Sequence, residues 1–280
     1  MQMSSPEVEA LARELLAAYV TGEMIAVLPS ARPGFELNTA YEVEALLKQF
    51  RAADGHKAVG RKVGYANKAM WRVLKLETLV WAHMYDDTVH YSEHNSATLS
   101  LAHPRSLKIE PEIIFGLKHA PMVEGGEAPD AATALASTDW VAVGFEIIDC
   151  PFSGWQFQPS DFVASFGLHA ALVVGERMQV SADRIAALVE ELPRFRVRMV
   201  KNGEFVEEGS GRNSLKSPAL CLAELGAAIV RRSPAEPLSA GEIVSSGTLT
   251  AGHPTGRGDL WTVEVEGLSL LPPPPLTVRL

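Results

Sequence analysis

The feature that most constrains this chain is a pair of glutamates in an otherwise apolar, strand-forming stretch at residues 108–115. Side chains alternate between the two faces of a strand, so Glu110 and Glu112 lie on the same face. Their like charges repel each other, and a divalent cation would relieve that repulsion. Ligands that are all oxygen atoms favour a hard cation such as Mg²⁺, Mn²⁺ or Ca²⁺. The alternative is a solvated edge strand, which Pro111 favours because it cannot donate a hydrogen bond to a sheet.

A third carboxylate, Glu146, is the one charged residue in the apolar run of residues 141–148. A buried acid must be paired, protonated or bound to a cation. Glu146 therefore forms either a salt bridge with an arginine or the third member of a carboxylate set with Glu110 and Glu112. Such a set would leave the remaining positions around an octahedral cation to water and substrate.

Two neighbouring cations, Arg61 and Lys62, interrupt a predicted strand at residues 59–65. Either one of them points inward or both extend to the surface. A desolvated lysine beside a metal ion is able to act as an acid or a base near neutral pH. Asp86 and Asp87 present a similar choice, since only one of two neighbours in a strand faces a given side.

His169 is a lone histidine in the apolar run of residues 167–175. Such a residue is either part of the core or, because histidine titrates near neutral pH, a catalytic acid or base. The sequence Gly209-Ser210-Gly211 lacks the lysine and hydroxyl residue that a phosphate loop needs. The sequence also contains no nucleophile elbow, zinc-protease motif or dinucleotide-binding fingerprint.

Composition limits the classes of partner. The 280 residues carry a formal net charge of −9, which argues against a nucleic-acid-binding or anionic-membrane surface. An anionic small substrate is still compatible, because a bound metal ion inverts the local field. The two cysteines, Cys150 and Cys221, have neither disulfide nor metal-ligand spacing. With no signal-peptide pattern and no apolar run of transmembrane length, we expect a cytoplasmic protein.

Many short strands with a few helices predict an α+β fold rather than a doubly wound α/β fold. Helices are expected at residues 6–20, 39–53, 67–74, 184–192 and 217–232, and strands at 59–65, 84–91, 108–115, 141–150, 168–175, 241–249 and 260–265. Asn202-Gly203 predicts a type I′ hairpin, and the four prolines at 272–275 predict an extended spacer before a last strand. We expect a small N-terminal helical/mixed lobe at residues 1–75 and a catalytic domain at residues 76–280.

The order and spacing of several motifs resemble the fumarylacetoacetate hydrolase superfamily. These motifs are Gly60-Arg61-Lys62-Val63-Gly64, Asp87, Glu110-x-Glu112-Ile113, Glu146-Ile147-Ile148-Asp149, Gly209-Ser210-Gly211, Ser217-Pro218-Ala219-Leu220, Ser246-Gly247-Thr248-Leu249 and Gly258-Asp259. The likeness covers residues 6–270. Within the superfamily, the chain is similar to the 2-oxopent-4-enoate (2-hydroxypentadienoate) hydratases and the 4-oxalocrotonate decarboxylases, for which a helical N-terminal lobe is typical.

The resemblance implies a mixed β-roll in which Glu110, Glu112 and Glu146 hold Mg²⁺ or Mn²⁺. It also implies acid–base roles for Lys62 and Asp87, to which we add His169 as a candidate catalytic residue. Four residues are expected to bind the substrate: Ser165, Phe166, Ser246 and Gly247. The implied partners are a small 2-oxo or 2-hydroxydienoic acid, further copies of the chain in a homo-oligomer, and a pathway partner enzyme.

Two departures from the family pattern lie near the expected substrate end. Asp149 is followed by Cys150-Pro151, where the family often has Ser-Arg. Residues 164–169 replace the frequent family sequence Ala-Asp-Asn-Ala-Ser-Ser. Both departures leave the metal set intact and predict a more apolar pocket at Phe166.

We therefore expect a metal-dependent lyase that hydrates a 2-hydroxy-2,4-dienoate to a 4-hydroxy-2-oxo acid. The same metal platform would also serve a 2-oxo-dioic acid decarboxylase or an acylpyruvate C–C hydrolase. A further alternative is a non-catalytic subunit of a hydratase–decarboxylase complex. The buried charges argue against that alternative, because a scaffold does not need them and they cost stability.

Overall fold

The computed structural model describes residues 3–233, 235–270 and 274–280. Its α-helices are α1 (Ser5–Thr21), α2 (Leu37–Ala53), α3 (Lys68–Leu74), α4 (Ala131–Ala136), α5 (Pro159–Ala164), α6 (Ile185–Glu191) and α7 (Pro218–Arg232). Its strands are β1 (Ala58–Gly64), β2 (Val80–Tyr85), β3 (Val89–Tyr91), β4 (Ser96–Thr98), β5 (Leu107–Leu117), β6 (Thr138–Asp149), β7 (His169–Val174), β8 (Met178–Gln179), β9 (Arg196–Lys201), β10 (Glu204–Ser210), β11 (Ile243–Ser245), β12 (His253–Pro254), β13 (Leu260–Glu266) and β14 (Leu276–Arg279). Within the predicted proline spacer, Pro272 and Pro273 lie outside the described residues.

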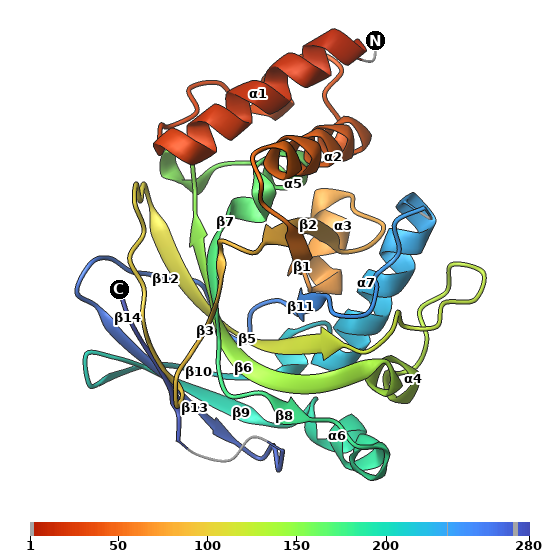
Figure 1. Cartoon of the computed structure of the whole chain (residues 1–280), viewed down its shortest axis with the longest axis vertical. Coiled ribbons are helices and arrows are strands. Elements are labelled where there is room, and N and C mark those ends of the chain that lie inside the picture. Colours follow the sequence, from red (N-terminus) through yellow and green to blue (C-terminus); the bar gives the residue numbers. More distant parts are fainter. Residues whose placement is uncertain (1–2, 234, 271–273) are drawn as a thin grey trace.

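Two sheets form the centre of the molecule (Figure 1). The larger has nine strands in the order β2-β1-β11-β5-β6-β7-β3, with β12 beside β5 and β8 beside β6. Its long central pair, β5 and β6, is antiparallel, whereas β1 with β11 and β3 with β7 are parallel. The smaller sheet has five strands in the order β10-β9-β13-β14-β4. Mixed sheets with helices around them confirm the predicted α+β class.

The alternation of side chains along β5 separates the core from the candidate site. Ile109 and Ile113 are fully buried in the main hydrophobic core, which also contains Trp261 of the smaller sheet. Burial of apolar side chains contributes most of the free energy that stabilises such a core. Glu110 and Glu112 occupy the intervening positions and project from the other face of the strand.

β5 is an internal strand, so the edge position that Pro111 favoured is wrong. β11 pairs with residues 114–116 of β5 and β12 with residues 108–109, which leaves residues 110–113 without a partner among the described strands on that side. Residues 246–252 cross this gap as a loop, and Leu249 N donates to the Pro111 carbonyl over 2.9 Å. An N–H group at position 111 would point into this same gap. Its absence in proline therefore leaves no carbonyl of a neighbouring strand without a donor.

Helices α1, α2 and α5 pack together over one end of the larger sheet (Figure 1). They share a second hydrophobic cluster, which includes Leu11, Val43 and Phe162. Asp161 of α5 accepts hydrogen bonds from the backbone nitrogen and the hydroxyl of Ser30 at 2.6 and 2.7 Å. The lobe boundary at residue 75 stays a prediction. Of the helices that the structure describes, none is long and apolar enough to cross a membrane.

Two predicted strands are shorter in the structure. The strand expected at residues 84–91 is divided into β2 and β3 by a turn, in which Thr88 Oγ1 donates to the Tyr85 carbonyl at 2.9 Å. The strand expected at residues 241–249 is reduced to β11. The reason is Gly247, whose φ of +88° turns the chain out of the ladder and into the loop that crosses the gap.

The predicted hairpin and the predicted helix at residues 217–232 are both confirmed. Asn202 and Gly203 have φ angles of +53° and +86°, as a type I′ turn requires. α7 begins at Pro218, directly after Ser217. The Ser217 hydroxyl, however, is buried and makes no capping hydrogen bond.

Gly144 of β6 lies opposite Glu112 in the ladder, so a substitution there tests how tightly this part of the sheet is packed. An added Cβ would lie 2.6 Å from Ile114 Cγ1 and 2.9 Å from the Val173 carbonyl oxygen. We expect Gly144→Ala to lower the free energy of unfolding by about 1–3 kcal/mol, because overpacking displaces neighbouring strands. Gly256→Ala is the matched control, since a Cβ there meets no atom within 4 Å. Urea unfolding measures both variants, and equal stability would contradict the expectation.

Candidate active site

Three carboxylates meet on one face of the β5–β6 pair. Glu110 and Glu112 project from β5, and Glu146 projects from β6, where its register partner is Glu110. One oxygen of each carboxylate lies within 4.8 Å of the other two. Glu112 and Glu146 are 1% and 0% exposed, whereas Glu110 is half-buried. The structure therefore brings together the three residues predicted as metal ligands.

Burial and mutual repulsion determine the charge of this carboxylate cluster. Burial raises the pKa of Glu110 to about 7, with Lys62 opposing the shift and Glu146 adding to it. Burial, followed by the charges of Glu146 and Glu110, raises the pKa of Glu112 well above its usual value. Burial also opposes ionisation of Glu146, but the Lys62 ammonium and the hydrogen bond with His169 outweigh it and hold its pKa below the usual value. Without a cation, the cluster thus keeps protons near neutral pH.

The donor atoms of the carboxylate cluster fit a hard divalent cation. Glu112 Oε2 accepts hydrogen bonds from Ser245 Oγ and, at 2.8 Å, from Gly247 N. Glu112 Oε1 is buried and has no hydrogen-bond partner among the described residues. Such an oxygen costs free energy unless a proton or a cation satisfies it. A donor set made of oxygen atoms only matches Mg²⁺ or Mn²⁺ better than a soft metal.

Lys62 lies beside the carboxylate cluster, and its neighbour Arg61 faces the other way. Lys62 Nζ is 3.0 Å from Glu146 Oε2 and donates to the Gly167 carbonyl at 2.9 Å. Its side chain is buried, with Nζ 4.8 Å from the centre of the Phe162 ring. Arg61 pairs with Glu242 on the opposite face of β1. The alternative in which both cations extend to the surface is wrong, because Lys62 and Arg61 are 2% and 4% exposed, and Lys62 is the one directed toward the carboxylate cluster.

His169 contacts the carboxylate cluster through Glu146. Its Nδ1 lies 2.9 Å from Glu146 Oε1, and its Nε2 lies 3.0 Å from Thr88 Oγ1. The Thr88 hydroxyl already donates to the Tyr85 carbonyl, so it accepts the hydrogen bond from Nε2. The imidazole is therefore fixed between Thr88 and Glu146, and it is not among the side chains that line the cavity described next.

Two members of the carboxylate cluster, Glu110 and Glu112, line a cavity of about 690 Å³, whereas Glu146 is not among the residues that line it. Lys62 lines the cavity beside them. The larger apolar and aromatic side chains of the lining are Val63, Tyr65, Ile148, Trp155, Phe157, Phe162, Leu168 and Leu215. Four further cations also line it: Lys68, Lys108, Arg212 and Lys216. A cavity of this size and lining is typical of a small-molecule site.

Known proteins share both the sequence and the fold. The 4-oxalocrotonate decarboxylase of Pseudomonas sp. (strain CF600) is 30% identical over 95% of this chain and 96% of the relative. The chain belongs to the hydratase and decarboxylase branch of the fumarylacetoacetate hydrolase superfamily. The 2-hydroxyhexa-2,4-dienoate hydratase of Comamonas testosteroni is 27% identical over 93% of this chain and 94% of the relative. No family model matches the chain.

Solved structures confirm the predicted superfamily fold. The 4-oxalocrotonate decarboxylase from Pseudomonas putida G7, complexed with magnesium and adipate, has a TM-score of 0.86 and 25% identity over 99% of this chain and 98% of that chain. A fumarylpyruvate hydrolase from Pseudomonas aeruginosa, with Mn²⁺ and pyruvate, has a TM-score of 0.54 at 18% identity and covers 79% of this chain and 88% of that chain. The second likeness shows a shared fold only.

The residues predicted to bind substrate take different places in this superfamily fold. Gly247 lines the cavity and donates its N–H to Glu112. Ser246 and Ser165 are buried, and the structure places neither among the residues that line the cavity. Phe166 is also absent from the lining, and its ring packs 4.2 Å from the ring of Tyr19 in α1. The apolar surface predicted at Phe166 is supplied by Phe162 and Leu168, its neighbours in the same segment.

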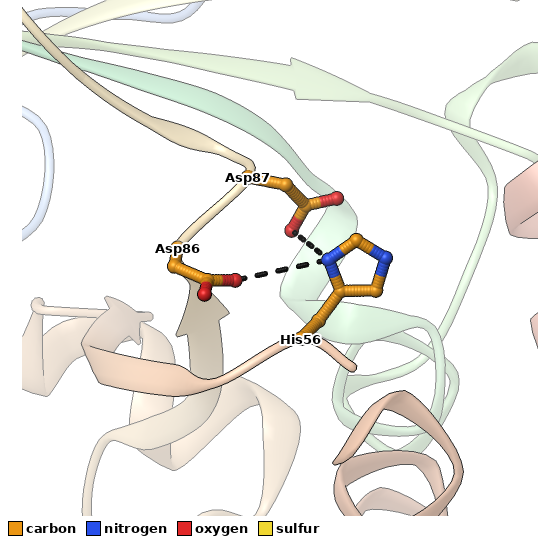
Figure 2. Close-up of side chains that lie close together, drawn as sticks. All are labelled: His56, Asp86 and Asp87. Carbon is orange, nitrogen blue, oxygen red and sulfur yellow. Dashed lines mark ion pairs between the residues drawn. The ribbon is translucent and has the colours of Figure 1, made fainter. Parts of the chain in front are cut away.

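Asp87 lies in a second group of charged side chains, which Figure 2 shows. His56 Nδ1 is 3.7 Å from Asp86 Oδ1 and 3.5 Å from Asp87 Oδ1. Arg51 Nη2 lies 2.6 Å from both oxygens of Asp87 and neutralises it. The structure does not place Asp87 among the side chains that line the cavity, because the β2–β3 turn directs it toward α2.

Sequence reasoning missed Ser245 and Thr88, which hold Glu112 and His169 in place. Ser245 directly precedes the recognised Ser246-Gly247 motif, so the position of the motif was a signal that could have identified it. Thr88 carries no comparable signal, because its contact with His169 depends on the parallel pairing of β3 with β7. Such pairing joins residues far apart in the chain and leaves no local pattern.

We expect metal binding to tighten as pH rises, because protons and the cation compete for Glu110 and Glu112. The pKa of Glu110, about 7, predicts that the apparent Kd for Mn²⁺ falls between mildly acidic and mildly alkaline pH. Glu112→Gln should weaken binding by roughly 100-fold or more, since even residues that only support a ligand contribute roughly 10–100-fold. Calorimetric titration of metal-free protein measures these effects.

Asp86→Asn, in the second charged group, is the control. Equal loss in that variant, or a Kd independent of pH, would contradict the assignment.

Proposed function

We propose that the chain is a metal-dependent hydratase that adds water to a 2-hydroxy-2,4-dienoate and forms a 4-hydroxy-2-oxo acid. One observation carries this proposal: the carboxylate cluster of Glu110, Glu112 and Glu146 with Lys62 beside it, of which Glu110, Glu112 and Lys62 line a large cavity. The reaction class is supported by relatives named 2-keto-4-pentenoate hydratase and 2-hydroxypent-2,4-dienoate hydratase, at 26% and 28% identity.

In this proposal Glu110, Glu112 and Glu146 hold Mg²⁺ or Mn²⁺. When bound, the cation supplies Lewis-acid polarisation of the substrate's carboxylate and 2-oxygen. The protein fixes two of the carboxylates before any ligand arrives. Ser245 and Gly247 N hold one oxygen of Glu112, and His169 holds one oxygen of Glu146. Preorganised ligands of this kind keep the site in one geometry.

The reaction needs proton transfers and one addition. The dienoate loses its 2-hydroxyl proton and gains a proton at C5, which gives a 2-oxo-3-enoate. The oxygen of water then adds to C4, and a proton reaches C3. One water molecule is consumed, and no oxidation or reduction occurs. Lys62 is the residue we propose to move these protons, since it is buried beside the carboxylate cluster and lines the cavity.

We assign His169 a positioning role, because its ring lies between Glu146 and Thr88 rather than in the cavity wall. No proton transfer is assigned to Asp87, whose carboxylate is paired with Arg51. Gly247 is the one member of the predicted substrate-binding set that we place in contact with substrate.

The second candidate is decarboxylation of a 2-oxo-dioic acid. Its support is the relative at 30% identity and the structure with a TM-score of 0.86, both named 4-oxalocrotonate decarboxylase. Both reactions begin with a chelated 2-oxo acid. Product analysis separates them, because decarboxylation releases CO₂ and hydration retains every carbon.

Activity is expected when Mg²⁺ and 2-hydroxypenta-2,4-dienoate are supplied together, as loss of the dienoate absorbance. Lys62→Met should lower kcat by roughly 10²–10⁴-fold, the range for a general acid or base. Lys118→Met, at an exposed lysine, is the matched control and should keep full activity. Unchanged dienoate absorbance, while an authentic hydratase removes it in the same buffer, would refute the substrate assignment.

We also propose that the chain forms a homo-oligomer, as the resemblance implied. Its location in the cytoplasm and its association with a pathway partner enzyme stay predictions. Three apolar side chains at the end of α1 and in the loop after it support the oligomer: Val20, Met24 and Val27 are 57%, 49% and 54% exposed. Light scattering is expected to give a mass above that of one chain, and Val20→Asp should reduce it. A monomeric mass for the unmodified protein would contradict this proposal.

A further inference from the structure

Tyr65 lines the cavity at a point where the backbone is strained. It directly follows β1, the strand that carries Lys62. Continued strand alternation would place residue 65 on the face of Arg61, away from the carboxylate cluster. Tyr65 instead has a φ of +58°, and the strand ends before it. Left-handed backbone is costly for a bulky residue and persists where its surroundings require it, often at functional sites.

Neighbouring groups hold Tyr65 in this conformation. Its carbonyl accepts hydrogen bonds from the Trp71 indole N–H at 2.6 Å and from Asn67 N at 2.7 Å. Its ring packs edge-on against Phe162, with the two ring centres 5.5 Å apart. The centre of the Phe162 ring in turn lies 4.8 Å from Lys62 Nζ. The cavity wall therefore continues from the carboxylate cluster through Lys62 and Phe162 to Tyr65.

Three of the described side chains that line the cavity carry a hydroxyl group: Tyr65, Thr248 and Thr250. Thr248 Oγ1 donates to the Thr250 carbonyl at 3.0 Å, and Thr250 Oγ1 donates to the Ala251 carbonyl at 2.9 Å. The Tyr65 hydroxyl forms no hydrogen bond with any residue that the structure describes. Of the three, it is therefore the hydroxyl that is available to a ligand.

The protonation state of Tyr65 suits it to contact an uncharged oxygen. Burial raises the pKa of Tyr65 to about 12, and the carboxylate of Asp161 adds to the shift. The phenol therefore keeps its proton near pH 7. A neutral phenol is able both to donate and to accept a hydrogen bond, as binding of a water molecule or a hydroxyl group requires.

We infer that the Tyr65 hydroxyl hydrogen-bonds to the oxygen atom at C4 of the substrate and so positions the water molecule that adds there. This inference rests on the proposed function. With the substrate's carboxylate and 2-oxygen held at the carboxylate cluster, C4 and C5 extend away from it along the cavity wall. As the C3–C4 double bond opens, the water oxygen bonds to C4, water gives up one proton and C3 receives one. Tyr65 keeps its own proton and then contacts the 4-hydroxyl group of the product.

A packing role for the ring is the competing explanation. Phenylalanine would fulfil that role, because the contact with Phe162 requires only the ring. Phenylalanine would also avoid a half-buried hydroxyl group without a protein partner, which costs free energy. The unpaired hydroxyl on a strained backbone therefore favours a contact with a ligand.

The test compares two inhibitors of dienoate hydration on Mg²⁺-loaded protein. They are 4-hydroxy-2-oxopentanoate and 2-oxopentanoate, which differ only in the 4-hydroxyl group. We expect the inhibition constant of the hydroxy acid to be roughly fivefold lower, the effect of one neutral hydrogen bond. Tyr65→Phe should bring the two constants within about twofold of each other and lower kcat by roughly fivefold to tenfold.

Tyr91→Phe is the matched control, because it removes a hydroxyl group from an exposed tyrosine of β3. It should keep both kcat and the preference for the hydroxy acid. The Kd for Mn²⁺ should be the same in Tyr65→Phe as in the unmodified protein, since the Tyr65 hydroxyl contacts no member of the carboxylate cluster. Thermal unfolding of each variant confirms that it is folded.

The outcomes separate this inference from the proposed function. Equal inhibition constants in the unmodified protein, or a preference that survives in Tyr65→Phe, overturn the role of Tyr65 while hydration of the dienoate leaves the proposed function in place. Full activity of Tyr65→Phe assigns the ring to packing and also overturns the inference. Absence of dienoate hydration by the unmodified protein overturns the proposed function and this inference with it.

Discussion

The repulsion among three neighbouring carboxylates, two of them fully buried, is the constraint on which the rest of this structure depends. Glu110 and Glu112 share one face of β5, and Glu146 faces them from β6. Their partners come from separate elements: Lys62 of β1 and Ser245 of β11 come from one side of β5, and His169 of β7 comes from the other. The order of strands in the larger sheet is what brings these elements together. Removal of one partner of a buried charge is costly, so sheet and site stabilise each other.

Strand alternation is a local rule, so the sequence was sufficient to place Glu110 and Glu112 on one face. The apolar surroundings of Glu146 marked it as a buried acid, and the family resemblance assigned it to the same set. The positions of Asp87 and Phe166 could not be predicted in the same way. A turn replaces the strand expected around Asp87, and Phe166 adopts a φ of +55° that directs its ring toward Tyr19. Both outcomes depend on contacts with α1 and α2, which no local pattern reports.

The two neighbouring cations of β1 show how one strand serves two environments. Arg61 lies over the Trp81 ring and pairs with Glu242, while Lys62 enters the carboxylate cluster. Sequence reasoning recognised that the two cations could be divided between the faces of the strand. The direction followed only from the pairing of β1 with β11, which sets the face that meets β5 and β6.

The gap in the ladder beside Pro111 has a consequence for how this enzyme family diversifies. Residues 246–252 cross the gap and contact Glu112, yet both of their ends are anchored by short strands that pair with β5. Insertions or substitutions in this loop can therefore change the surroundings of the metal ligands while every strand keeps its register. Loops tolerate such changes far better than sheets do. Because strand pairing is interrupted beside residues 110–113 of β5, sequence changes in the loop can alter the environment of the metal ligands without changing the sheet.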